Sequence, residues 1–550
     1  MIPANTNSLN TNSFNVRLLS GFLLAIMMVI PVESMYGQSS QGQAENPVIW
    51  ADVPDPSVIR VGNTYYMSST TMHMNPGVPI MKSDDLVHWE IVNYAYDKLG
   101  ETDHHTLSNG ADEYGRGSWA SSLRYHDGVY YVATFSYTTR KTYIFKTRDI
   151  ENGSWETFEL DRFFHDPSLF FDEGRAFLIY GVDDIQIVEL TADASAIKEG
   201  GVDRVLIADS KKIMGAENYY VPAEGAQVYK ENGRYYVMLI TWPSDGMRTQ
   251  VAYRADELLG DYTGKVILED QGVAQGGIIE TPDGDWYGFL FKDHGSVGRI
   301  PMLVPVEWEN GWPMMGVDGK VPDKLPIKAG DDGISGIVAS DEFDSDLAPA
   351  QYNDETEILE GLPLVWQWNH VPDPAYWSLT DRPGYLRLTN GRIDSSFTST
   401  RNTLTQRTFG PQSTGSVLVD ISNLKDGDRA GLGALQGTYG YVGVKVEGGK
   451  KYLTMVKGAP DSVEEVDTQP LNQDEVYLKI AFDFKDLTDT AYFYYSIDGN
   501  TWNEIGEPLQ MQYTLDHFMG YRFALFNYAT KHTGGFADFD YFRINPGVEN

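Results

Sequence analysis

The sequence predicts an all-β protein in which a five-bladed β-propeller is followed by an antiparallel β-sandwich. The first observation is an internal repeat of a small-residue turn, an apolar strand, a tight turn and a second apolar strand rich in aromatic residues. The repeats begin at Asp55, Trp119, Asp166, Glu224 and Gln275, at spacings of about 45 to 65 residues, which is the size of a propeller blade. The second observation is that the repeat ends before residue 341, where alternating strands joined by Asp-Gly and Gly-Gly turns take over.

The composition agrees with this fold class and restricts the function. A chain of 550 residues is too long for one ordinary domain, and 42% hydrophobic residues are enough for sizeable cores. Aromatic residues make up 13%, which suits strands, and their flat faces also suit sugar rings. There is no cysteine, which excludes disulfides, a thiol nucleophile and a cysteine-ligated metal.

The chain is strongly acidic, with 78 acidic against 42 basic residues and a formal net charge of −36. Nucleic-acid binding requires a basic surface, so we expect no nucleic-acid partner. Anionic membranes and anionic substrates are disfavoured for the same reason. The charge therefore favours a neutral ligand.

Residues 1–40 are interpreted as a secretory signal peptide that is cleaved. The apolar run Leu18–Val32 follows Arg17, is shorter than the roughly 20 residues that span a bilayer, and precedes small and polar residues. The mature protein is expected to be exported, periplasmic or secreted, with no membrane contact after cleavage. The alternative is a single membrane anchor.

The repeat and the strand pattern divide the mature chain into two domains. The propeller is predicted over residues 46–326, a polar and glycine-rich linker over 327–340, and the sandwich over 341–550. The clearest sandwich strands are Ser416–Ile421, Tyr439–Val446, Ala491–Ile497 and, as the last strand, Asp538–Asn545.

One turn position carries the candidate chemistry. The first strand of each blade lines the propeller axis, so the turns that enter these strands gather at one end of the channel. They deliver Asp55, Trp119, Asp166, Glu224 and Gln275. Glycoside hydrolysis needs one carboxyl group as acid and one as base or nucleophile. A third carboxyl group can keep the acid protonated by repulsion. Trp119 would stack on a sugar ring. The alternative is that each Asp-Pro only forms a local turn.

Several motifs resemble those of glycoside hydrolase family 43. They are NPVIWADVPDPSVI around Asp55, WASSLRYHDGVYYV around Trp119, HDPSLFFDEGRAFLIYG around Asp166, VPAEGAQVYKENGRYYV around Glu224 and VGRIPMLVPVEWENGWP from Val297. The resemblance extends from about Asn46 to Asn545 and includes a C-terminal concanavalin-like sandwich of the type found in β-xylosidases of that family. It implies an inverting enzyme with a five-bladed propeller.

The resemblance also implies a role for each acid. Asp55 would be the general base that activates water, Glu224 the general acid, and Asp166 the residue that tunes the acidity of Glu224 and orients it. Asp52 is the alternative to Asp55, although it lies outside the Asp-Pro-Ser turn. Inversion requires room for a water, so we expect the carboxyl groups of Asp55 and Glu224 to lie about 6.5–9.5 Å apart.

Four further residues are candidates for contacts at the pocket. Arg299 matches an arginine of the family that reaches the sugar and the acid; the alternative is a surface ion pair. Gln275 stands where some relatives carry a histidine. His294 is expected at the channel axis as a ligand of calcium or water, or else as a buried structural residue. The run Thr70–Pro79 is expected to form a loop over the pocket, in which His73 shapes a subsite or only packs.

Two acids of the sandwich, Asp341 and Asp540, lie near its predicted first and last strands. These strands are neighbours in many similar folds, so the pair is a candidate for a structural calcium, which prefers carboxylate and carbonyl oxygens. No cofactor is expected for the chemistry itself. The segment Ser399–Pro411 is polar for a strand, and we expect it either to help close the pocket or to form an edge strand.

The resemblance implies an exo-acting glycosidase that releases terminal pentose, β-D-xylose or α-L-arabinofuranose, from xylan- or arabinoxylan-type polysaccharide or its oligosaccharides. An endo-arabinanase is an alternative, but it needs an open cleft. A non-catalytic glycan-binding protein is another alternative, although such a protein would be expected to lack one of the three acids, and all three are present.

Overall fold

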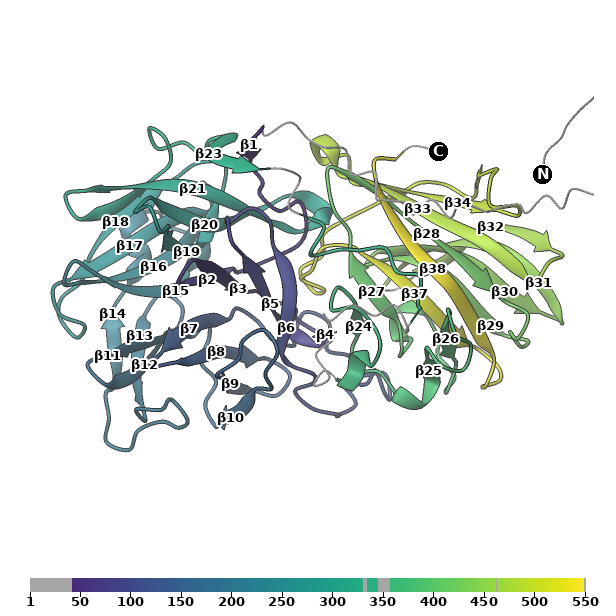
Figure 1. The fold of residues 1–550 in the computed structure, drawn as a ribbon, viewed down its shortest axis with the longest axis horizontal. Helices are drawn as coiled ribbons and strands as arrows, with labels where there is room; N and C mark the ends of the chain where they lie inside the picture. The colour runs from purple at the N-terminus through teal and green to yellow at the C-terminus, as the bar shows by residue number, and fades with distance from the viewer. Residues whose placement is uncertain (1–41, 330–333, 345–356, 461, 549–550) are drawn as a thin grey trace, which may run out of the picture. The chain divides into compact units, whose positions relative to one another are not determined.

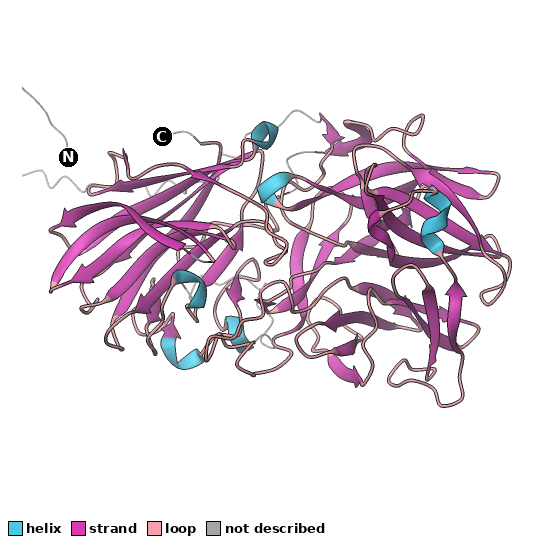
Figure 2. Cartoon of the chain, turned by 180° about the vertical axis from the view of Figure 1, so that it is seen from behind, coloured by secondary structure: helices cyan, strands magenta, loops and turns pink. Residues whose placement is uncertain are grey.

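The computed structural model describes residues 42–329, 334–344, 357–460 and 462–548. The predicted signal peptide, residues 1–40, lies outside these ranges. Within them, no helix is long and apolar enough to cross a membrane. Strands make up almost all of the regular structure, and the helices of the described ranges are short 3₁₀ turns (Figure 2).

The N-terminal part forms five antiparallel sheets of four strands each (Figure 1). Blade 1 contains β2 (Ser57–Val61), β3 (Thr64–Ser68), β5 (Gly77–Ser83) and β6 (Glu90–Tyr96); blade 2 contains β7 (Ser122–His126), β8 (Val129–Ser136), β9 (Lys141–Thr147) and β10 (Glu156–Leu160); blade 3 contains β11 (Ser168–Asp172), β12 (Arg175–Tyr180), β13 (Ile185–Leu190) and β14 (Asp203–Ile207). Blade 4 contains β15 (Tyr219–Glu231), β16 (Arg234–Pro243), β17 (Thr249–Ala255) and β18 (Thr263–Leu268), and blade 5 contains β19 (Ala274–Glu280), β20 (Trp286–Asp293), β21 (Arg299–Glu309) and β22 (Trp312–Met315). Two 3₁₀ turns, η1 (Ser210–Met214) and η2 (Gly295–Val297), lie between strands.

The five first strands close a ring. They contact one another in the order β2, β7, β11, β15, β19 and back to β2. The five-bladed propeller predicted from the repeats is therefore confirmed.

Hydrogen bonds at the axis repeat from blade to blade. Each runs from a backbone N–H of one first strand to a serine hydroxyl of the preceding blade: Leu123 N to Ser57 Oγ (3.0 Å), Leu169 N to Ser122 Oγ (3.1 Å) and Val228 N to Ser168 Oγ (3.2 Å). The guanidinium of Arg124 adds bonds to Ser168 Oγ (3.0 Å) and Gln227 Oε1 (3.1 Å), so side chains of blades 2, 3 and 4 meet around one charge. These bonds fix the register between blades, and with it the turn that precedes each first strand.

The C-terminal part is an antiparallel sandwich of two sheets, as predicted (Figure 1). The strand order is β32-β31-β30-β29-β37-β27-β24-β4 in one sheet and β25-β26-β38-β28-β33-β34-β35 in the other, with β36 paired to β34. The strands of the first sheet are β24 (Gln367–Asn369), β27 (Leu404–Arg407), β29 (Asp428–Leu435), β30 (Tyr439–Glu447), β31 (Lys450–Ala459), β32 (Ser462–Leu471) and β37 (Arg522–Ala529), together with the propeller strand β4 (Met74–Asn75). Those of the second are β25 (Trp377–Ser378), β26 (Leu386–Thr389), β28 (Gln412–Asp420), β33 (Glu475–Asp483), β34 (Thr490–Ser496), β35 (Asn503–Glu504), β36 (Leu509–Gln510) and β38 (Phe536–Pro546), and the 3₁₀ turns are η4 (Glu357–Leu359), η5 (Pro374–Tyr376), η6 (Phe397–Ser399) and η7 (Lys485–Leu487).

The two domains share a sheet edge and an apolar core. Strand β4, which lies in the run Thr70–Pro79, pairs with β24 of the sandwich, with Asn75 opposite Trp368. One connected hydrophobic cluster contains Trp89 of the propeller and Trp366 of the sandwich, both almost completely buried. The run Thr70–Pro79 is therefore fixed by the sandwich and is not a free loop over the pocket.

Two stretches differ from the sequence-based expectation. β1 (Gly42–Glu45) pairs with β23 (Lys324–Ala329), so the first residues of the predicted linker 327–340 belong to a strand. β27 lies between β24 and β37, so the segment Ser399–Pro411 contains an interior strand, and its interpretation as a pocket loop or an edge strand is wrong there. The polarity has another cause: Arg407 of this strand is buried and donates a hydrogen bond to the propeller.

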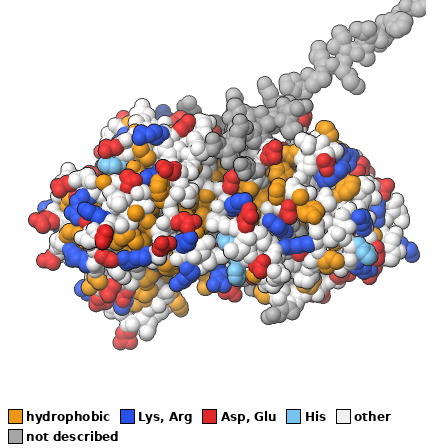
Figure 3. Space-filling view, turned by 90° about the horizontal axis from the view of Figure 1, so that it is seen from below, with side chains coloured by type: hydrophobic (Ala, Val, Ile, Leu, Met, Phe, Trp, Pro, Cys, Tyr) orange, Lys and Arg blue, Asp and Glu red, His pale blue; other side chains and the backbone are white. Residues whose placement is uncertain are grey.

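Acidic and basic side chains are interspersed over the face of the molecule shown in Figure 3. On this face the acidic side chains therefore do not form one continuous patch, although the whole chain has a net charge of −36.

Candidate active site

The turns that enter the first strands meet around a small cavity at the propeller axis. Residues from all five blades line it, among them Asp55, Ala120, Asp166, Gly225 and Gln275. Four of these share a left-handed backbone, with φ of 51° at Asp55, 47° at Asp166, 70° at Gly225 and 62° at Gln275. This conformation is uncommon for residues other than glycine and is often retained at functional sites. The repeat therefore places Asp55, Asp166 and Gln275 at equivalent positions around one cavity, as predicted.

Glu224 and Trp119 stand one residue earlier than the equivalent position of their blades. The axial hydrogen bonds align Ser57, Ser122, Ser168 and Gln227, so the residues equivalent to Asp55 and Asp166 are Ala120 and Gly225. The expectation that all five residues share one position is thus wrong by one residue in blades 2 and 4. The Glu224 side chain is also the most open of the three acids, 23% exposed against 6% for Asp55 and 5% for Asp166.

Asp55 is bound by an arginine and a threonine. Arg299 Nη1 lies 3.1 Å from both carboxylate oxygens, and Thr70 Oγ1 donates to Oδ2 at 2.6 Å. Burial opposes the charge of Arg299, but the Asp55 carboxylate outweighs this and raises the pKa of Arg299. Arg299 is 3% exposed, so the alternative of a surface ion pair is wrong.

Asp52, the alternative to Asp55, serves the fold. Its Oδ1 accepts a hydrogen bond from Arg299 N at 2.7 Å and its Oδ2 from Gly520 N at 3.0 Å. Its backbone oxygen accepts from Arg407 Nε at 3.0 Å. Because both carboxylate oxygens are occupied, one within the propeller and one by the sandwich, Asp52 is poorly placed to activate water.

His165, Asp166 and Glu224 form one charged cluster. His165 Nε2 lies 2.9 Å from Glu224 Oε2 and 3.7 Å from Asp166 Oδ2. Burial acts to lower the pKa of His165, but the charges of Asp166 and Glu224 outweigh it and raise the pKa to about 9. Burial raises the pKa of Asp166 to about 7; His165 opposes the shift, and repulsion from Glu224 and Asp55 adds to it. At neutral pH a protonated imidazole therefore stands beside two acids, and Asp166 is near the midpoint of its titration.

The sandwich contributes an aromatic residue to the same site. The ring of Phe518 stacks on Trp119, with 4.9 Å between ring centroids and an interplanar angle of 15°. The same ring lies 4.6 Å from the guanidinium of Arg299, whose Nη2 donates to Phe518 O at 3.4 Å. Sequence reasoning missed Phe518 because no local pattern marks it, and it missed His165 although this residue lies inside the HDPSL motif. Both domains therefore build the wall of the site.

Two family models match this chain. Glycosyl hydrolases family 43 matches residues 44–313, and the Beta xylosidase C-terminal Concanavalin A-like domain matches residues 359–545. A putative beta-xylosidase of Xylanibacter ruminicola is 31% identical to this chain over 86% of it and 85% of the relative. The chain belongs to glycoside hydrolase family 43. The resemblance seen in the sequence motifs is confirmed, and the protein is a glycoside hydrolase.

Other relatives of this family 43 chain carry two kinds of name. A beta-xylosidase of Formosa agariphila is 28% identical over 92% of this chain and 91% of the relative. A non-reducing end alpha-L-arabinofuranosidase of Bacteroides ovatus is 25% identical over 72% of this chain and 74% of the relative. Among solved structures, a bifunctional GH43-CE protein of Bacteroides eggerthii is 54% identical with a TM-score of 0.89, over 93% of this chain; the chain spans only 64% of that protein.

Two predicted histidines of the family 43 protein lie away from the acids. His73 is completely buried, with ring centroids 5.0 Å from His370 and 4.8 Å from His517. The expectation that it shapes a subsite is wrong; it packs where β4 joins the sandwich. His294 stands edge-on to Trp50 at 5.0 Å and donates a hydrogen bond to the sandwich backbone at Phe484, and burial lowers its pKa. These contacts place His294 at the domain junction and not at the channel axis.

Asp341 and Asp540 fit a calcium site poorly. Asp341 is paired through its backbone with Phe542 of the last strand, as predicted. However, its carboxylate already accepts hydrogen bonds from Phe343 N and Trp366 Nε1, both at 2.8 Å. In the part of the chain that the structure describes, three metal-ligating side chains converge only at His165, Asp166 and Glu224. A calcium in the sandwich stays a prediction.

Proposed function

We propose that this protein is an inverting exo-glycosidase that releases terminal β-D-xylose or α-L-arabinofuranose from neutral xylan- or arabinoxylan-type chains. One observation carries the proposal. Two non-adjacent blades deliver Asp55, paired with Arg299, and Glu224, hydrogen-bonded to His165, to the same site, where both acids act on the Asp166 carboxyl. Hydrolysis of a glycosidic bond with inversion needs such a pair, with a base on one side of the sugar and an acid on the other.

The surroundings of each acid support a distinct role. Asp55 is the general base, because Arg299 and Thr70 bind its carboxyl group and fix its direction. Glu224 is the general acid, because its more open side chain can reach a leaving group at the pocket mouth. His165 Nε2 lies 2.9 Å from Glu224 Oε2, so the other oxygen, Oε1, is the one that can face the leaving group.

Asp166 is a positioning residue in this proposal. It lies within the same cluster as His165 and Glu224, and its repulsion favours a proton on a neighbouring acid.

The aromatic pair and the relatives support a terminal pentose as the substrate. Trp119 and Phe518 form a flat wall on which a sugar ring can stack, and Phe518 narrows the site from the sandwich side. Relatives named for xylose and for arabinofuranose have similar identities to this chain, 28% and 25%. We therefore propose both sugars as substrates. An endo-arabinanase would need an open cleft where Phe518 stands.

The proposal is tested with nitrophenyl β-D-xylopyranoside and nitrophenyl α-L-arabinofuranoside, with the product anomer followed by NMR. We expect hydrolysis of at least one substrate with inversion. Retention of configuration would refute the roles of Asp55 and Glu224, and a wild-type protein that hydrolyses no pentoside or pentose oligosaccharide would favour the non-catalytic alternative.

Two variants separate the acid from the base. Asp55→Asn should lower kcat by about 10²- to 10⁴-fold on every substrate, because water activation is always needed. Glu224→Gln should lose as much on natural oligosaccharides but far less on dinitrophenyl glycosides, whose leaving group needs no proton. Asp127→Asn, at a side chain that is 91% exposed, is the control. Equal losses of the two variants on dinitrophenyl glycosides would contradict the assignment.

We further propose that residues 1–40 direct export of the mature enzyme. N-terminal sequencing of protein recovered outside the cytoplasm should show cleavage before residue 46. An uncleaved chain that stays with the membrane fraction would support the anchor instead.

A further inference from the structure

A groove outside the catalytic site lies between the propeller and the sandwich. The segment 107–116, which leads from β6 to β7, forms one side, and the sandwich segments 392–399 and 514–517 form most of the other. The groove has a volume of about 1330 Å³, above the roughly 300–1,000 Å³ of pockets for small ligands. Neither Asp55, Asp166 nor Glu224 lines it, so it is separate from the proposed chemistry.

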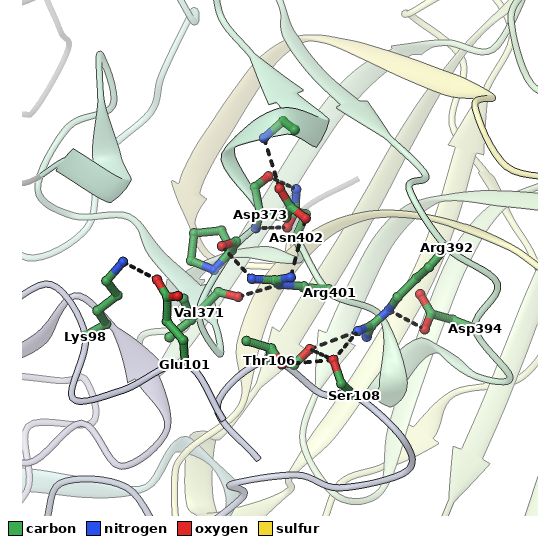
Figure 4. Close-up of polar contacts among 12 residues, drawn as sticks. Lys98, Glu101, Thr106, Ser108, Val371, Asp373, Arg392, Asp394, Arg401 and Asn402 are labelled. Carbon is green, nitrogen blue, oxygen red and sulfur yellow. Dashed lines mark hydrogen bonds and ion pairs between the residues drawn. The ribbon is translucent and has the colours of Figure 1, made fainter. Parts of the chain in front are cut away.

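Arg392 ties the two sides of the groove together (Figure 4). Its Nη1 donates to Thr106 O at 2.9 Å, just before the propeller segment, and lies 3.3 Å from Ser108 Oγ within it. Its Nη2 donates to Ser399 O at 2.8 Å, and its Nε donates to Asp394 at 2.9 Å. One side chain thus fixes both walls, and the groove is formed before any ligand arrives.

Two more side chains brace the walls. Tyr114 of the propeller segment donates its hydroxyl hydrogen to Thr398 O at 2.7 Å. Arg401 donates to Val371 O at 2.9 Å and pairs with Asp373, which holds the chain behind the 392–399 segment (Figure 4). The ordering of both walls is therefore supplied by the fold, and a ligand does not have to provide it.

One end of the groove adjoins the wall of the active site. Gly115 lines the groove, and its carbonyl accepts a hydrogen bond from Trp119 Nε1 at 3.1 Å. A Cβ on Gly115 would lie 2.5 Å from Asp516 O, so the two walls touch here. Asp516 also lines the groove and stands two residues before Phe518, the stacking partner of Trp119. An extended ligand in the groove would therefore end beside the aromatic pair of the active site.

The lining of the groove suits a neutral ligand with many hydroxyl groups. Six serine and threonine side chains line it: Ser108, Ser395, Thr398, Ser399, Thr514 and Thr530. The charges of the lining nearly balance, with two arginines against three aspartates, and Arg392 pairs with Asp394. Two exposed aliphatic side chains, Ile393 at 55% and Leu515 at 72%, offer apolar contacts to the flat faces of sugar rings.

We propose that this groove is a second, non-catalytic binding site for a neutral polysaccharide main chain. It holds the polymer while a terminal or branching sugar enters the catalytic cavity past Trp119 and Phe518. The choice of a pentose-containing chain rests on the proposed function; the neutral, hydroxyl-rich character of the ligand rests on the groove itself. The strongly acidic protein would repel an anionic polymer.

The binding test uses soluble arabinoxylan and xylohexaose with the Glu224→Gln protein, in which turnover is slow. Affinity electrophoresis and calorimetry should detect binding in this background. Ser395→Trp, which fills the groove from an exposed position, and the double change Ile393→Ala with Leu515→Ala should each weaken binding by about 5- to 10-fold. The double change Val463→Ala with Leu487→Ala, at aliphatic side chains 61% and 57% exposed outside the groove, is the matched control and should bind like its parent.

A kinetic test in the otherwise wild-type enzyme separates the groove from catalysis. The groove variants should lower kcat/KM on arabinoxylan by the same factor and leave kcat/KM on nitrophenyl pentosides unchanged. Equal binding and equal polymer activity in all variants would overturn the groove proposal while the proposed function stands. If the protein hydrolyses no substrate but still binds the polymer through the groove, the groove proposal stands and the proposed function is overturned. A dimer seen by size exclusion that Ser395→Trp abolishes, without polymer binding, would assign the groove to a protein interface and overturn the proposal.

Discussion

Replacement of Asp166 by asparagine should stabilise the folded protein while it lowers activity. The Asp166 carboxyl is buried in the cluster with His165 and Glu224, and its pKa is raised from 3.8 to about 7. Asparagine has nearly the same shape and carries no ionisable group. The variant therefore removes the electrostatic cost of this acid and leaves the packing in place.

The sign follows from the proton count of the two states. Between pH 3.8 and about pH 7 the unfolded chain has released the Asp166 proton while the folded protein keeps it, so the stability of the wild type falls as the pH rises. The rise of the Asp166 pKa from 3.8 to about 7 corresponds to a loss of folding stability on the order of 4 kcal/mol in total. About 3 kcal/mol of this loss appears between pH 5 and pH 8. His165, whose pKa is raised from 6.5 to about 9, also loses its stabilising contribution as the pH rises through 9. Removal of Asp166 also makes the pKa of His165 rise less. Both effects therefore make the variant lose less stability than the wild type as the pH rises.

Thermal unfolding of both proteins at pH 5, 6, 7 and 8 and constant ionic strength measures this effect. The Tm of Asp166→Asn should exceed that of the wild type by a margin that grows with pH, by about 3 °C from pH 5 to pH 8. The activity on nitrophenyl pentosides should fall at least about 10-fold at the same time. Asp127→Asn, at an exposed side chain, should run parallel to the wild type.

A Tm difference that stays constant or shrinks as the pH rises would refute the reasoning. It would mean that the folded protein does not hold the Asp166 proton near neutral pH. A constant offset alone would reflect only the change of side chain, since that contribution does not depend on pH.

Three further predictions follow from the site and the domain junction. Phe518→Ala should raise KM for nitrophenyl pentosides by about 10-fold, because the stacked pair with Trp119 is worth roughly 1 kcal/mol or slightly more, and Phe518→Tyr should restore it; an unchanged KM would contradict the placement of this ring at the substrate. Burial lowers the pKa of His517 to about 3, so the stability present above pH 6.5 is lost as the pH falls towards 3. In urea titrations, His517→Gln should reduce the loss of stability between pH 6.5 and pH 4 by about 3 kcal/mol. An equal loss of stability in both proteins would disprove this prediction. Chelation with EDTA should leave Tm unchanged, because both oxygens of the Asp341 carboxylate already accept hydrogen bonds from the protein. A fall in Tm that calcium reverses and Asp540→Asn abolishes would instead establish a calcium site in the sandwich.

Local turn chemistry made most of the propeller predictable. Each blade repeats a small-residue turn and two apolar strands, and the Asp-Pro-Ser turns at Asp55 and Asp166 adopt the same left-handed conformation in the structure. Such turns depend on a few neighbouring residues, so their pattern is visible in one sequence. The alternation of the sandwich strands is equally local, and its last strand was predicted within two residues at its first end and one at the other.

The one-residue offset of Glu224 and Trp119 was less visible. The sequence aligns them with the aspartates because all stand near a small residue before a strand. The true register is set by amide-to-serine hydrogen bonds between blades, such as Val228 N to Ser168 Oγ, and these bonds form only when neighbouring blades pack together.

The sequence by itself determined the all-β class, the five blades, the domain order and the three acids, since turns and strand patterns are short-range properties of the chain. Tertiary structure alone decided that Phe518 reaches Trp119, that His73 is buried at the junction and that Asp52 joins the two domains. These contacts link residues that are far apart in the chain, and their free energy comes from burial and hydrogen bonds that form only when the sandwich packs on the propeller. The same packing forms the groove beside the active site, whose walls come from both domains.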